Sequence, residues 1–180
     1  EDVMREYCEL HFGEPAADLM VQALFQMEEN LVTPLDTNPG IARYYALVKA
    51  AGVTMSAGRK QRDYRWRLHM QKAALDQYLQ SKLRRELDKE QRVRGVLGSV
   101  RAGPQDAAIA QAIAILREPA ETEAMQELRN EAGQLGEESD QRHGDRNLGY
   151  FKLQTPLRNL PGAIELLEQA QSAKSDEEKR

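Results

Sequence analysis

The prolines divide this chain into segments, and within each segment the apolar residues recur at helical spacing. Pro15, Pro39, Pro104, Pro119 and Pro161 each stand just before an apolar pattern of this kind. Proline fits best in the first turn of a helix, because its φ angle is held at about −65° and it has no N–H group to donate. These prolines therefore predict where successive helices begin.

The stretch HFGEP is the clearest corner between two such helices. Asp2 is a suitable cap for a first helix that runs to about His11, and Gly13 supplies the left-handed residue that ends it. Pro15 then begins a second helix. We expect Phe12 to fold back onto this pair of helices.

Apolar residues three and four positions apart predict an all-α fold, an irregular bundle of about six to seven helices. The predicted segments are 2–11, 15–32, 38–52, 56–93 and those that follow Pro104, Pro119 and Pro161. The longest segment is expected to form a long central helix, with an apolar stripe at Tyr64, Leu68, Leu75, Tyr78, Leu79, Leu83 and Leu87. The only hint of strand alternation is a short piece from Gly149 to Leu153.

Two segments depart from simple amphipathic helices. AAIAQAIAILR, after Pro104, is apolar nearly all round, so we expect it to be buried on several sides and placed centrally. Residues 139–159 lack helical periodicity and are predicted to be an irregular loop. Residues 1–174 are expected to form a single helical domain, followed by a frayed charged tail at 175–180.

The composition excludes several classes of protein. The chain has one cysteine, so it cannot contain an internal disulfide framework. No apolar run approaches the roughly 20 residues that span a bilayer, so no membrane span is expected. The chain opens with Glu-Asp rather than Met, which favours a processed protein or a piece of a longer one.

Candidate chemistry is sparse. Cys8 and His11 lie three apart on one predicted helix, but no second Cys/His pair completes a metal site, and a core thiol is the better interpretation. No glycine-rich phosphate loop is present, so we predict neither a metal nor a cofactor. His69 lies among basic residues and is expected to be solvated. No catalytic residue is predicted.

The irregular loop is the candidate binding site, because loops held on a rigid scaffold often carry function. Its candidate residues are Arg142, His143, Asp145, Arg146 and Tyr150. No nucleophile stands near them in the sequence, so the loop favours binding over catalysis.

A basic, aromatic segment raises the question of nucleic acid. Residues 59–101 carry thirteen basic and five acidic side chains, a net charge of +8 within a chain of net charge −4. Arginines interleaved with Tyr64 and Trp66 are able to stack on bases and neutralise phosphates. The alternative places Tyr64 and Leu68 in the core and pairs the arginines with acidic helices or water. Because the pI is about 5.5, nucleic-acid binding through the helix at 59–94 is the less favoured function.

The corner after the first helix resembles the opening of a helical region that follows the catalytic barrel in bacterial glycoside-hydrolase-like proteins. The matching residues are Phe12, Gly13, Pro15, Ala16 and Ala17. The helix with Trp66 and Tyr78 looks like the long helix of those regions, and TPLRNLPGAIELL, residues 155–167, is similar to their return segment.

The resemblance implies a non-catalytic accessory domain in carbohydrate metabolism, because the active-site carboxylates of that family belong to the preceding barrel. The implied partner is that catalytic domain, with a homodimer as a further option. The implied location is secreted or periplasmic, and otherwise cytoplasmic. The alternative function is a free-standing helical protein–protein interaction module that uses Tyr44, Tyr45 and Trp66.

Overall fold

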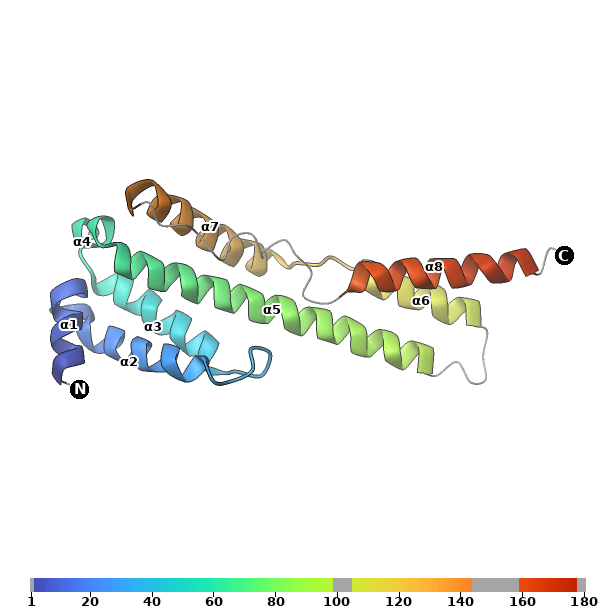
Figure 1. Ribbon diagram of the computed structural model, residues 1–180, viewed down its shortest axis with the longest axis horizontal. Helices are drawn as coiled ribbons and strands as arrows, with labels where there is room; N and C mark the ends of the chain where they lie inside the picture. The colour runs from blue at the N-terminus through green and yellow to red at the C-terminus, as the bar shows by residue number, and fades with distance from the viewer. Residues whose placement is uncertain (1, 99–104, 144–158, 178–180) are drawn as a thin grey trace. The chain divides into compact units, whose positions relative to one another are not determined.

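A computed structural model describes residues 2–98, 105–143 and 159–177, and those residues form eight helices and no strand (Figure 1). The helices are α1 (Asp2–Phe12), α2 (Glu14–Asn30), α3 (Gly40–Thr54), α4 (Ala57–Arg62), α5 (Tyr64–Gly98), α6 (Gln105–Arg117), α7 (Glu123–His143) and α8 (Leu160–Glu177). The all-α prediction is therefore confirmed. None of these helices is both long enough and apolar enough to cross a membrane.

The chain divides into two compact units. The first unit comprises residues 1–81 and 123–154, and so contains α1 to α4, the first half of α5, and α7. The second unit comprises residues 82–122 and 155–180, and so contains the second half of α5, α6 and α8.

Three apolar clusters form the core of the first unit. They join α1 to α2 and the end of α3, then α2 and α3 to α5, and finally α5 to α7. Their fully buried members are Cys8, Ala16, Ala17, Met20, Ala23, Tyr44, Val48, Ala51, Ala73 and Tyr78. Full burial of a large apolar side chain stabilises a fold by about 1.5–3 kcal/mol, so the large members of these clusters anchor the unit.

The corner between α1 and α2 forms as the sequence predicts. Gly13 has a φ angle of 94°, which glycine adopts without strain, and the proline that follows lies in the first turn of α2. Phe12 is 1% exposed and belongs to the core. The guanidinium of Arg59 donates to the carbonyl oxygens of Leu10 and His11, at 2.9 and 3.2 Å, and so caps the end of α1.

The prediction of one helix from residue 56 to 93 is wrong, because the chain breaks at Asp63. Asp63 has an extended backbone, with φ of −89° and ψ of 108°, and its side chain accepts the N–H of Arg65 at 2.8 Å. A carboxylate that accepts this N–H acts as a helix cap. It ends α4 and begins α5.

The buried face of α5 matches the predicted stripe only in part. Tyr78 is buried as predicted, and Leu75 and Leu79 pack against it. Leu68 is 37% exposed, however, and Met70, Ala73 and Ala74, outside the stripe, are buried. The helix is therefore rotated so that Met70, Ala73 and Ala74, rather than Leu68, face the core. Helical spacing alone cannot choose between faces that each carry apolar residues.

The second unit has a smaller core. Val93, Ala112, Ile115 and Leu116 form its cluster, and side chains of α8 pack against it. The prediction that α6 is buried on several sides is wrong, because residues 105–107, 110, 111 and 114 are exposed and the buried positions lie in its second half. Alanine-rich turns add little apolar area, so they do not require burial on every side.

The predicted loop at 139–159 begins too early. Helix α7 continues to His143, so the first five residues of that segment are helical. The remaining residues of the predicted loop, up to 158, lie outside the part of the chain that the structure describes.

Candidate functional site

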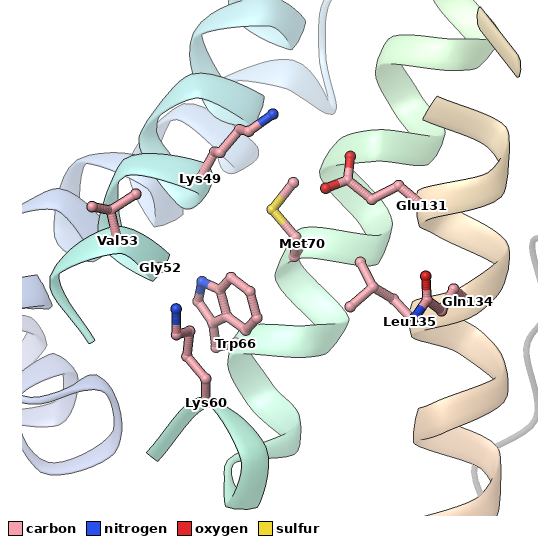
Figure 2. Close-up of a pocket in the computed structure, with 9 residues that line it drawn as sticks. All are labelled: Lys49, Gly52, Val53, Lys60, Trp66, Met70, Glu131, Gln134 and Leu135. Atoms are coloured by element: carbon pink, nitrogen blue, oxygen red, sulfur yellow. The ribbon is translucent and has the colours of Figure 1, made fainter. Parts of the chain in front are cut away.

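A pocket of about 310 Å³ opens in the first unit between α3, α4, α5 and α7 (Figure 2). We call it the Trp66 pocket. Its lining residues are Lys49, Gly52, Val53, Lys60, Trp66, Met70, Glu131, Gln134 and Leu135. The volume lies at the lower end of the range of about 300–1,000 Å³ that is usual for small-molecule sites.

The indole of Trp66 forms the aromatic wall of the pocket (Figure 2). Its Nε1–H donates to the carbonyl oxygen of Val48 at 3.2 Å, which fixes the ring against α3. Gly52 makes this contact possible, because a Cβ atom at that position would overlap the six-membered ring of the indole. The glycine lies in the last turn of α3. Its function is to leave room for the indole.

Polar groups face each other across the pocket (Figure 2). Tyr45 links two of them: its hydroxyl donates to Oε2 of Glu131 at 2.8 Å and accepts from Nζ of Lys49 at 3.2 Å. Burial raises the pKa of Tyr45, and the hydrogen bond to Glu131 raises it further, so the phenol remains a neutral donor at physiological pH. Lys60 and Gln134 add a cation and an amide on opposite sides of the indole.

The pocket therefore combines an apolar surface with donors and acceptors. Trp66, Met70 and Leu135 offer a surface for the apolar face of a ligand. An amide both donates and accepts hydrogen bonds, a carboxylate accepts and an ammonium donates. This arrangement is suited to binding a ring that carries hydroxyl groups.

The three predicted interface residues differ in how much of their surface is exposed. Tyr44 has no exposed surface, so its prediction as an interface residue is wrong: it faces the core rather than solvent. Tyr45 and Trp66 are half-buried and stand at or beside the Trp66 pocket.

The binding site predicted in the irregular loop remains a prediction. Arg142 and His143 lie in the last turn of α7, although their side chains are outside the described part of the structure. Asp145, Arg146 and Tyr150 also lie outside the described residues.

His69 is half-buried, whereas its basic neighbours predicted a solvated side chain. Its Nδ1 lies 2.9 Å from the hydroxyl of Tyr44, and its ring packs edge-on against Phe12. Burial lowers the pKa of His69, and the charge of Lys72 lowers it further, while Asp63 opposes them. The neutral imidazole is therefore favoured, and its tautomer decides whether Nδ1 donates to the Tyr44 hydroxyl or accepts from it.

Cys8 is a core thiol. It has no exposed surface, and burial raises its pKa to about 11. Within the described ranges, no three His, Cys, Asp or Glu side chains come together in a way that could hold a metal ion.

Several basic side chains of the segment 59–101 donate hydrogen bonds to groups of the protein itself. Arg59 caps α1, and Arg67 donates to the carbonyl oxygen of Lys60 at 3.2 Å. In the second unit, Lys89 donates to the carbonyl oxygens of Leu116 and Glu118, at 3.4 and 2.5 Å. Cations held in this way have fewer donors left for phosphates, which favours a structural function for the segment.

Sequence reasoning missed most of the Trp66 pocket. Lys49, Lys60, Glu131 and Gln134 are ordinary charged or amide residues in the sequence, and more than 60 positions separate the lysines from the other two. Trp66 was the one usable signal, because it is the only tryptophan.

No protein family matches the chain, and no curated protein and no solved structure matches it either. Function therefore has to be inferred from the chemistry of the side chains.

Proposed function

We propose that this chain is a non-catalytic helical accessory domain of a larger bacterial glycoside-hydrolase-like protein, and that it contacts carbohydrate through the Trp66 pocket. The observation that carries the proposal is an indole wall with an amide, a carboxylate and two ammonium groups around it. The residues of the α1–α2 corner, which resemble those of such domains, support the same conclusion.

Sugar rings match this chemistry. The C–H face of a pyranose is apolar and flat enough to lie on an indole, while its hydroxyl groups donate and accept hydrogen bonds. Gln134 offers both kinds of partner, Glu131 accepts, and Lys49 and Lys60 donate. Pockets of this type obtain affinity from the apolar wall and specificity from a few polar groups.

Titration of the protein with oligosaccharides tests the proposal. Trp66 is the sole tryptophan, so its fluorescence reports directly on the pocket. We expect a saturable change in emission with at least one neutral or acidic oligosaccharide. Gln134→Ala removes an exposed amide from the pocket and should weaken binding by about fivefold, the value of one net hydrogen bond.

Gln126→Ala is the matched control, because Gln126 is also exposed on α7 and does not line the pocket. It should leave the affinity unchanged. Unchanged emission across a broad panel of sugars, or equal effects of the two alanine variants, would contradict carbohydrate binding here.

The proposed partner, a preceding catalytic domain, is tested by reading the gene sequence upstream of Glu1. If the chain is an accessory domain, the reading frame upstream of Glu1 encodes a region with the alternating strand and helix pattern of a barrel, at least about 200 residues long. A start codon immediately upstream would sink this part of the proposal. The alternative, a free-standing interaction module, would then be favoured, although Tyr44 is too buried to serve it.

A further inference from the structure

A second pocket, of about 400 Å³, lies in the first unit where the chain passes from α2 to α3. We call it the Asn38 pocket. Its lining residues are Gln26, Glu29, Thr33, Asn38, Pro39, Gly40 and Arg43. Unlike the Trp66 pocket, it contains no aromatic side chain, and five of its seven lining residues carry a hydrogen-bonding side chain.

The side chain of Asn38 has an unused donor in this pocket. The residue is 3% exposed, and its Oδ1 accepts the N–H of Gly40 at 2.8 Å. That hydrogen bond identifies which end of the amide is oxygen, so the other end is the NH₂ group. No group in the described structure accepts a hydrogen bond from this Nδ2. A buried donor without an acceptor is rare in proteins and marks a place where a bound group is expected.

Asn38 cannot readily turn away to find another acceptor. Nε2 of Gln80, itself 2% exposed, donates to the carbonyl oxygens of Asn38 and Leu35, at 2.6 Å in both cases. These bonds hold the segment before α3 against α5. The unused donor is therefore fixed in place.

The surroundings of Asn38 favour a negatively charged group. Pro39 is the N-cap of α3 and has no side-chain oxygen to cap the first turn. The N-terminus of a helix carries partial positive charge and exposed N–H groups, which favour anions. Arg43, in the first turn of α3, is exposed and has no ion-pair partner in the described residues.

Gly40 shapes the pocket, and Glu29 limits the kind of ligand that the pocket can hold. A Cβ atom at Gly40 would overlap the side chains of Asn30 and Gln26, so only glycine lets the helix start this close to α2. Glu29 places a carboxylate on the wall, and its Oε2 already accepts from Nε2 of Gln26 at 3.0 Å. A bare anion would be repelled there, whereas a ligand hydroxyl can donate to it.

We propose that the Asn38 pocket binds a small oxyanion that carries its own hydroxyl group. The oxyanion accepts hydrogen bonds from Nδ2 of Asn38 and the guanidinium of Arg43 at the start of α3. The hydroxyl group donates to Glu29. Inorganic phosphate, a sugar phosphate and a hydroxycarboxylate share this chemistry. The site is separate from the Trp66 pocket and does not depend on its function.

Nuclear magnetic resonance titration of the whole chain tests the proposal, since the side-chain amide of Asn38 has its own signal. The probes are inorganic phosphate, glucose 6-phosphate and glycerate, with chloride as the control for ionic strength. We expect saturable shifts of the Asn38 NH₂ and Gly40 N–H signals with at least one probe, and not with chloride. The probe that binds tightest separates phosphate from carboxylate ligands.

Asn38→Asp is the sharpest variant, because it keeps the acceptor for Gly40 and replaces the free donor with a charged oxygen. It should weaken binding by at least about tenfold, since charge-assisted hydrogen bonds are lost and repulsion is added. Asn130→Asp makes the same chemical change at an exposed site on α7 and should alter affinity less than twofold.

Arg43→Gln changes an exposed side chain, so it keeps the fold even if Asn38→Asp does not, and it should also weaken binding about tenfold. The proposal is overturned if no probe shifts the Asn38 signals, which would leave water as the partner of Nδ2. Shifts that chloride reproduces, or that survive in both Asn38→Asp and Arg43→Gln, overturn it equally.

Discussion

The two units reach stability by different means. The first unit buries large side chains completely: Phe12, Met20, Tyr44 and Tyr78 are at most 1% exposed. In the second unit Ala112 is fully buried, but Val93, Ile115 and Leu116 remain 6–9% exposed. The first unit therefore depends on its apolar core.

The second unit adds charged contacts to its smaller core. Arg92 forms a bidentate pair with Glu118, with N–O distances of 2.5 and 2.8 Å, and Arg117 pairs with Glu168 of α8. Exposed pairs of this kind contribute little to stability, because water and salt screen their charges. We infer that the second unit is the less stable of the two, because charge at its surface cannot replace buried area.

The largest expected effect is the loss of Phe12 from the first unit. Phe12→Ala leaves a cavity between α1, α2 and the end of α3, and should lower the free energy of unfolding by about 3–5 kcal/mol. Urea denaturation measures this. Phe25→Ala is the control, because Phe25 is 42% exposed and should cost less than about 1 kcal/mol. Equal losses would mean that this cluster does not anchor the unit.

The next effect concerns Lys89 in the second unit. Lys89 is 3% exposed, and its ammonium group donates to carbonyl oxygens at the end of α6. Burial lowers its pKa. Lys89→Met should destabilise the unit by about 1–3 kcal/mol, because buried acceptors lose their donor. Hydrogen exchange should show faster exchange in α6 and little change in α2 and α3.

Arg94→Met is the control for Lys89, because Arg94 is exposed and pairs only with Glu90 within the same helix turn. It should change stability by less than about 0.5 kcal/mol. If Arg94→Met accelerates exchange in α6 as much as Lys89→Met does, the carbonyl contacts are not what stabilises the unit.

The same substitution at two glycines should have opposite signs in the two units. Gly52→Ala pushes a methyl group into Trp66 and should destabilise the first unit by about 1–2 kcal/mol, despite the higher helix propensity of alanine. Gly95 lies in α5 with open space around it, so Gly95→Ala should stabilise by about 0.5–1 kcal/mol. Melting temperatures, with Trp66 fluorescence for the first variant, measure both.

The smallest expected effect is a pH dependence of the first unit through His69. Its pKa in the folded state lies below the ordinary value of 6.5. As the pH falls through about 6.5, the unfolded chain takes up a proton and the folded chain does not, so stability decreases until the lower, folded-state pKa is reached. Denaturation curves between about pH 7.5 and 5 should show this fall, and His69→Gln should reduce it.

Local chemistry made several features predictable from the sequence. Gly13 and the proline after it define the α1–α2 corner, because a positive φ angle and a fixed φ angle are properties of those residues themselves. The burial of Phe12 was predicted from its place at this corner, and that of Cys8 from the lack of a second Cys/His pair for a metal site. The break at Asp63 was missed, although an aspartate before a helix is a known cap.

The candidate sites were much less predictable. The Trp66 pocket joins Lys49, Trp66 and Gln134 from three helices, and the Asn38 pocket depends on Gln80, more than 40 residues away. A short stretch of sequence carries no information about contacts between residues so far apart in the chain.

The sequence by itself thus determined that this chain is helical and where its α1–α2 corner lies, because backbone torsion and helical periodicity act over a few neighbouring residues. Only the tertiary structure decided that Leu68 is exposed, that Tyr44 contacts the half-buried His69, and that Gly52 makes room for an indole. Those outcomes depend on which faces of distant helices pack together, and packing is decided by shape and volume across the whole unit.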